Sequence, residues 1–92
     1  MTSVTILIHG KVQGVAFRYH IKEKANSLGI DGWVRNRIDG SVEACLQGET
    51  HLVNQLVDWC RIGPAEASVD KIDISHSTSE VDLSGFMVRP TC

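Results

Sequence analysis

The segment from Gly10 to Arg18 holds the residues of this chain best suited to chemistry. It follows an apolar run, residues 4–8, and precedes a stretch with helical spacing, so it is expected to turn from a strand into a helix N-terminus. The first N–H groups of a helix have no partner within it, and the helix dipole adds partial positive charge there. The guanidinium of Arg18 adds a planar, permanent cation whose fork suits phosphate oxygens. These features predict a site for a phosphate or an acyl anion.

The spacing of apolar residues predicts the elements on either side of this turn. Residues 4–8 are rich in β-branched side chains, which is typical of a buried strand. One apolar stripe at helical spacing runs through residues 17–28, and Gly29 stands where a helix C′ residue belongs. A strand, a turn and a helix are therefore expected over the first third of the chain.

A hairpin and a second helix are expected next. Asp39-Gly40 separates two alternating segments, residues 30–38 and 41–47, and such a dipeptide is a strong hairpin signal. Thr50 is a suitable N-cap for a second amphipathic helix, which Gly63-Pro64 is expected to end.

Apolar residues at 69, 72 and 74 mark a fourth strand, and the odd first step predicts a bulge or an irregular start. A polar stretch, residues 75–84, then leads to a short apolar piece at 86–88 that could form a terminal strand. The order β-α-β-β-α-β predicts an α+β, ferredoxin-like sandwich, with one antiparallel sheet and two helices on one face. The whole chain, residues 1–92, is expected to form a single domain.

Composition and charge exclude several classes of protein. The net charge is −2, and residues 1–40 hold six Lys or Arg against three acidic residues, whereas residues 41–92 hold three against eight. This bias can attract a small anion, but it gives neither the basic face that nucleic acid requires nor an apolar run that could span a membrane. With no visible secretory signal, a cytoplasmic protein is expected. Three widely spaced cysteines are interpreted as reduced thiols, with Cys92 mobile at the chain end.

Two segments of the chain resemble the signatures of the acylphosphatase family. The first signature reads Gly-x-Val-Gln-Gly-Val-x-Phe-Arg, and the second reads Gly-aromatic-Val-basic-Asn-x-x-x-Gly-x-Val with a further Gly six residues on. Residues 63–69 also resemble the helix-to-strand turn of the family, so the resemblance covers nearly the whole chain. The matching residues are Gly10, Val12, Gln13, Gly14, Val15, Phe17 and Arg18 for the first signature, and Gly32, Trp33, Val34, Arg35, Asn36, Gly40, Val42 and Gly48 for the second.

The resemblance implies hydrolysis of acyl phosphates to carboxylate and inorganic phosphate, without a cofactor, a metal or a covalent intermediate. It implies that the Asn36 side chain positions the attacking water. The expected partners are a small acyl phosphate and inorganic phosphate or a similar anion, and the chain is expected to be a monomer. The resemblance assigns the cradling of the phosphoryl oxygens to the backbone of Gln13, Gly14, Val15, Ala16, Phe17 and Arg18, with Arg18 as the clamp.

The sequence is consistent with this chemistry because of what it lacks. It shows no Ser-His-Asp set, no paired carboxylates near the loop and no histidine cluster. An ester or amide hydrolase needs such groups to activate a nucleophile and to protonate a poor leaving group. An acyl phosphate instead expels a carboxylate, whose conjugate acid has a pKa of about 4, so no general acid is needed. A phosphate oxygen of the substrate is the candidate acceptor for the proton of the water.

Simpler interpretations stand beside these. Arg18 would otherwise be an exposed helix residue in a surface ion pair, and Asn36 a turn former. The four histidines are interpreted as non-catalytic, and the phenylalanine and tryptophan residues as packing residues. A solvated basic rim is expected from Lys11, Arg35 and Arg37.

Three rival functions were weighed. A regulatory anion-sensing domain would not require Asn36. An RNA-binding domain would need aromatic residues on residues 41–47, which have none. A domain of a larger carbamoyl-transfer enzyme would carry the same signatures. Pro90 is a departure that could alter a contact between the tail and the loop.

Overall fold

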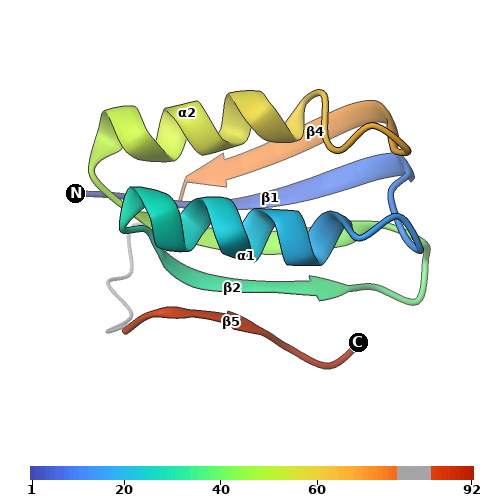
Figure 1. Ribbon diagram of the computed structural model, residues 1–92, viewed down its shortest axis with the longest axis horizontal. Coiled ribbons are helices and arrows are strands. Elements are labelled where there is room, and N and C mark those ends of the chain that lie inside the picture. Colours follow the sequence, from blue (N-terminus) through green and yellow to red (C-terminus); the bar gives the residue numbers. More distant parts are fainter. Residues whose placement is uncertain (77–83) are drawn as a thin grey trace.

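The structure is a computed structural model that describes residues 1–76 and 84–92 (Figure 1). Two helices lie over one face of a five-stranded sheet. The elements in chain order are β1 (Thr2–Lys11), α1 (Phe17–Leu28), β2 (Asp31–Asn36), β3 (Val42–Gly48), α2 (Thr50–Cys60), β4 (Ser68–His76) and β5 (Phe86–Val88).

The sheet has the strand order β4-β1-β3-β2-β5, and its first four strands are antiparallel to their neighbours. β5 pairs with β2 in parallel, so the expectation of a wholly antiparallel sheet is wrong for this edge. The reason is topological: β4 and β5 lie at opposite edges, and the chain reverses direction between them. A strand that runs antiparallel to β4 is therefore parallel to β1 and β2.

The core lies between the sheet and the helices and follows the period of each element. The buried residues of α1 are Phe17, Ile21 and Ala25, as the apolar stripe predicted. Alternate residues of β1 and β3 point toward the helices, and their side chains are almost fully buried. These strand residues are Val4, Ile6, Ile8, Val42, Ala44 and Leu46.

Two local predictions are resolved by the structure. The bulge predicted for the fourth strand is present, because Gly10 pairs with Val69 and His9 with Lys71, which leaves Asp70 out of register. Thr50 is the first residue of α2 and Glu49 its N-cap, so the prediction of Thr50 as the cap is wrong by one position. Most of the polar stretch at 75–84 lies outside the described residues.

One end of the sheet collects the segments that carry the two signatures. β1 and β2 run in the same direction and finish at this end, where α1 begins and α2 finishes (Figure 1). The β1–α1 loop, the β2–β3 turn and the α2–β4 turn therefore lie near one another. In the described part of the chain, no helix is long and apolar enough to cross a membrane.

Candidate active site

The β1–α1 loop is anchored to the core by buried apolar side chains, and two of its residues have left-handed backbone angles. Val12 and Val15 are buried, whereas Gly14 and Ala16 are exposed. Gly14 and Ala16 have φ angles of 75° and 60°, and Ala16 is the only non-glycine described with a positive φ. Left-handed residues thus alternate with residues of negative φ, and this alternation turns successive N–H groups toward one side. The loop has the backbone form of an anion-binding nest.

The start of α1 adds further N–H groups to the loop. Ala16 is the N-cap residue, no side chain caps the helix, and its first turn contains no acidic residue. The first intrahelical bond is made by the N–H of His20 to the carbonyl of Ala16, at 3.1 Å. The N–H groups before it have no partner within the helix and carry the positive end of its dipole.

Arg18 is half-buried on the first turn of α1. Within residues 1–76 and 84–92, its guanidinium makes no ion pair with an acidic side chain. The simpler interpretation of Arg18 as one half of a surface ion pair is therefore not supported there. Its charge is available to a ligand in the loop.

Asn36 is the last residue of β2, and its side chain oxygen is unusual. Its backbone lies opposite Val42 of β3, and its carbonyl accepts a hydrogen bond from the N–H of Cys92 at 3.2 Å. The side-chain Oδ1 is buried and accepts no hydrogen bond from any described residue. A buried acceptor without a donor costs about 1–3 kcal/mol. Such an acceptor can take a hydrogen bond from a water or a ligand.

The side chain of Gln13 joins the loop to the β2–β3 turn. Its Nε2 donates to the carbonyl of Arg37 at 2.7 Å and to the carbonyl of Ser41 at 2.9 Å. Arg37 directly follows Asn36 in the chain. The two signature segments are thus joined by one amide side chain.

The β2–β3 turn is itself fixed by local bonds. The N–H of Arg37 donates to the carbonyl of Ser41 at 2.9 Å, and Asp39 accepts hydrogen bonds from the hydroxyl and the N–H of Ser41 at 2.6 and 2.9 Å. These two bonds, the hydroxyl first, lower the pKa of Asp39 below its ordinary value. The turn that carries Asn36 is therefore well defined.

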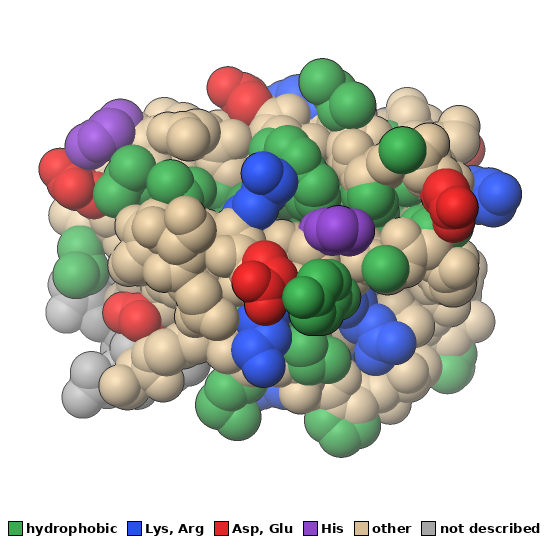
Figure 2. Space-filling model, in the orientation of Figure 1, with side chains coloured by type: hydrophobic (Ala, Val, Ile, Leu, Met, Phe, Trp, Pro, Cys, Tyr) green, Lys and Arg blue, Asp and Glu red, His purple; other side chains and the backbone are tan. Residues whose placement is uncertain are grey.

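The expectation of a solvated basic rim is wrong for two of its three residues. Arg35 pairs with Glu43 at 2.7 Å, and Arg37 approaches Glu43 at 3.6 Å and Asp39 at 3.7 Å. Lys11 is exposed. On the face that the two helices cover, basic and acidic side chains are interspersed and form no patch of one sign (Figure 2).

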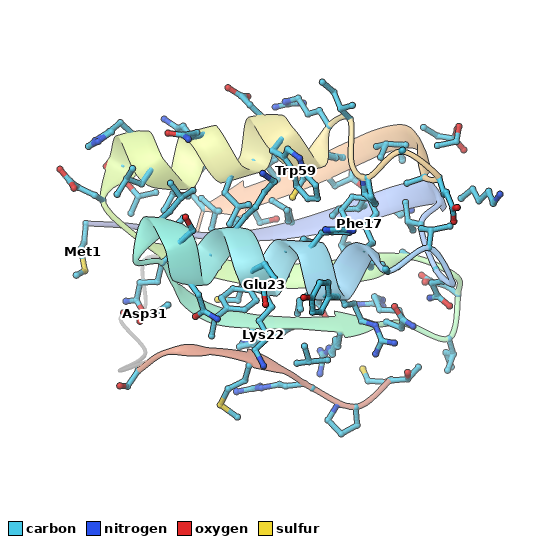
Figure 3. All side chains as sticks on the ribbon, viewed as in Figure 1. Met1, Phe17, Lys22, Glu23, Asp31 and Trp59 are labelled. Carbon is cyan, nitrogen blue, oxygen red and sulfur yellow. The ribbon has the colours of Figure 1, made fainter. Side chains whose placement is uncertain are left out.

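The aromatic residues pack, as predicted. Phe17 meets Trp59 edge to face, with their ring centroids 5.7 Å apart, between the two helices (Figure 3). On the other side of the sheet, the guanidinium groups of Arg35 and Arg89 lie 4.7 and 4.9 Å from the ring centroid of Trp33. The two strands β1 and β3 contain no Phe, Tyr or Trp that could stack on a base in the manner of an RNA-binding sheet.

The three cysteines lie in the described part of the chain and form no disulfide. Burial raises the pKa of the Cys60 thiol to about 12, and it also raises the pKa of Cys45. Both thiols therefore stay protonated at neutral pH and are poor nucleophiles. Among the described residues, no three His, Cys, Asp or Glu come together in a way that could hold a metal ion.

Sequence reasoning missed two contributions at this end of the molecule. The C-terminal residues continue along β2: the carbonyl of Cys92 accepts from the N–H of Ile38 at 2.9 Å, so Cys92 is tied to the turn rather than mobile. The α2–β4 turn borders the loop across an open pocket of about 360 Å³. Gly63-Pro64 was interpreted as the end of a helix and as part of a helix-to-strand turn, and no local signal connects that turn with the loop.

Comparison with known proteins gives one consistent result. The family model described as Acylphosphatase matches residues 4–88. The acylphosphatase of Albidiferax ferrireducens is 50% identical over 91 residues, which cover 97% of each chain, and that of Thiobacillus denitrificans is 47% identical over 89 residues, covering 97% of this chain and 98% of the other. The crystal structure of acylphosphatase from Bacillus subtilis superposes with a TM-score of 0.93 at 31% identity, covering 97% of this chain and 99% of the other.

Proposed function

Since the chain belongs to the acylphosphatase family and is an enzyme that hydrolyses acyl phosphates, we propose that a positioned water attacks phosphorus directly, without a metal ion or a covalent intermediate. The observation that carries this proposal is the buried Oδ1 of Asn36, which has no donor among the described residues. The residue after Asn36, Arg37, accepts a hydrogen bond from Gln13 of the loop that has the backbone form of an anion nest.

The loop binds the phosphoryl group in this mechanism. The backbone N–H groups of residues 13–18 cradle its oxygens, and the guanidinium of Arg18 clamps them. Support comes from the alternating φ signs at Gly14 and Ala16, from the uncapped start of α1 and from the guanidinium of Arg18, which forms no ion pair among the described residues. Such preorganised donors stabilise negative charge as it develops in the transition state.

Asn36 holds the water. Its Oδ1 accepts a hydrogen bond from the attacking water, which fixes the water relative to phosphorus and removes much of the entropic barrier. The bond from water oxygen to phosphorus forms as the bond from phosphorus to the carboxyl oxygen breaks. The carboxylate leaves with the electron pair and needs no proton, because its conjugate acid has a pKa of about 4. The proton of the water passes to a phosphate oxygen.

The compartment and the oligomeric state of the enzyme are proposed from its thiols and its surface. The three free thiols suit a reducing compartment, and we place the enzyme in the cytoplasm. The large exposed apolar side chains among the described residues are scattered rather than gathered, which favours a monomer.

Isotope labelling tests the route of attack. Benzoyl phosphate is hydrolysed by the wild-type enzyme in ¹⁸O-water with a chelator present, and the label is located by mass spectrometry. Direct attack on phosphorus places one ¹⁸O in phosphate and none in benzoate, at an undiminished rate. Label in benzoate, loss of the activity with the chelator, or phosphate bound covalently to the protein after an acid quench would each contradict the mechanism.

A further inference from the structure

An open pocket of about 360 Å³ borders residues 14–16 of the β1–α1 loop. Three loop residues form one wall, the turn after α2 forms the other, and His20 closes one side. The volume lies in the range of pockets that hold small ligands. The residues that border it are Gly14, Val15, Ala16, His20, Pro64, Ala65 and Glu66.

The far wall of this pocket is a fixed turn. The N–H of Ala67 donates to the carbonyl of Pro64 at 2.9 Å, which leaves Ala65 and Glu66 exposed at the tip. The turn also sits on α1: a Cβ added to Gly63 would lie 2.7 Å from the ring of Phe17. Because Phe17 is the first residue of α1, the turn and the loop share one anchor and keep their spacing.

The position of the pocket relative to Asn36 indicates which part of the substrate would face the pocket. On one side of the loop, Gln13 reaches the β2–β3 turn, next to Asn36. On the other side, residues 14–16 face the α2–β4 turn. In phosphoryl transfer the attacking and leaving oxygens lie roughly in line. A water held by Asn36 therefore requires the leaving carboxyl oxygen to point away from Asn36. Because the β1–α1 loop lies between the β2–β3 turn and the α2–β4 turn (Figure 1), this direction leads toward the pocket.

We propose that this pocket receives the acyl group of the substrate and that Glu66 makes it select against acyl groups with a second negative charge. The inference rests on the proposed function, because it assumes that Asn36 holds the attacking water. The surroundings of the acyl group are apolar at Val15, Pro64 and Ala65, and no Lys or Arg borders the pocket. The carboxylate of Glu66 repels a second carboxylate there, so neutral and cationic acyl groups are favoured.

A matched pair of substrates measures this selection. The specificity constant kcat/KM is compared for benzoyl phosphate and for 4-carboxybenzoyl phosphate, which differ by one carboxylate. Relative to wild type, Glu66→Gln is expected to raise the ratio of the 4-carboxy to the unsubstituted substrate about fivefold, and Glu66→Lys more. Glu49→Gln, which removes an exposed carboxylate at the start of α2, leaves the ratio unchanged. An unchanged ratio in both Glu66 variants would overturn the inference while benzoyl phosphate hydrolysis still supports the proposed function.

A binding measurement separates the two claims further. Amide NMR shifts are recorded with inorganic phosphate and with benzoylmethylphosphonate, an analogue that cannot be hydrolysed. Phosphate is expected to shift residues 13–18 alone, and the phosphonate to shift Ala65 and Glu66 as well. If the phosphonate shifts only the loop, the acyl group does not enter the pocket. If phosphate leaves the loop unshifted, the cradle fails and the inference falls with it.

Discussion

The two helices of this protein begin in similar ways but at opposite ends of the sheet, and only one start is equipped as a site (Figure 1). Neither α1 nor α2 has a side-chain cap at its N-terminus, and neither has an acidic residue in its first turn. Both expose backbone N–H groups and the positive end of a dipole. The differences between the two helices show what a helix N-terminus needs, besides free N–H groups and the dipole, to form an anion site.

The residue before each helix sets the first difference. Ala16, before α1, is left-handed, with φ 60° and ψ 24°, and follows the left-handed Gly14, whereas Glu49, before α2, is extended, with φ −63° and ψ 134°. The loop before α1 is therefore curled into a cradle. The second residue of each helix sets the other difference: it is Arg18 in α1 and His51 in α2. An anion at α2 would also face the carboxylate of Glu49.

The largest expected effect comes from removing the cation at α1. Arg18→Ala is expected to lower kcat/KM for benzoyl phosphate about 10³-fold, because it removes the main charge opposite the transferring phosphoryl group. The check is steady-state kinetics beside Arg61→Ala, an exposed arginine near the end of α2 that should behave as wild type. The reverse change, His51→Arg, puts an arginine at the equivalent position of α2. It is expected to create no phosphate binding by calorimetry, and binding there would show that a helix start and an arginine suffice.

A smaller effect is expected from removing the hydrogen bonds that join the β1–α1 loop to the β2–β3 turn. Gln13→Ala removes the two bonds to the carbonyls of Arg37 and Ser41. Each such bond contributes about 1 kcal/mol, so unfolding in urea should show a loss of about 1–2 kcal/mol. Activity should fall about tenfold, since the loop and Asn36 are no longer held together. Gln55→Ala on the exposed face of α2 is the control. Equal losses of stability and activity in both variants would show that the two bonds of Gln13 do not hold the loop in place.

The smallest effect compares two left-handed glycines, one before and one after α1. Gly14 and Gly29 have φ angles of 75° and 70°, and a Cβ added at either meets no atom within 4 Å. Replacement by alanine should therefore cost each about 1–2 kcal/mol of backbone strain and nothing from packing. Thermal unfolding should show similar losses. KM should rise a few-fold only for Gly14→Ala, and a matching rise for Gly29→Ala would mean that the strain acts globally rather than in the cradle.

The sequence predicted the parts of this architecture that depend on local spacing. The apolar stripe of residues 17–28 and the alternation in β3 define the core faces, and Asp39-Gly40 marks the hairpin. Parts that depend on distant partners were missed. The parallel pairing of β5 follows from where the chain crosses the sheet, and the pairing of Arg35 and Arg37 with Glu43 follows from the strand register.

The candidate site shows the same division. The glycine-containing turn and Arg18 pointed to a phosphate site, and the resemblance to the acylphosphatase family added Gln13 and Asn36, but their simpler roles could be separated only in three dimensions. The ion pair that Arg18 could have made is not found among the described residues, and the Oδ1 of Asn36 proves to be buried without a donor there. The pocket at residues 64–66 joins segments far apart in the chain, and no sequence pattern reports such a meeting.

The central claim is that Asn36 holds the water while the cradle holds the phosphate, and Asn36→Ala tests it most directly. Two quantities are measured: kcat for benzoyl phosphate and the inhibition constant for inorganic phosphate, with Asn54→Ala on the exposed face of α2 as the control. The account predicts that kcat falls about 10²–10³-fold while the inhibition constant changes less than about twofold. Since the Oδ1 of Asn36 is a buried acceptor with no donor among the described residues, the variant should be no less stable than the wild type, and its free energy of unfolding should rise by up to about 1–3 kcal/mol. Phosphate affinity lost together with kcat, or kcat retained, would contradict the account.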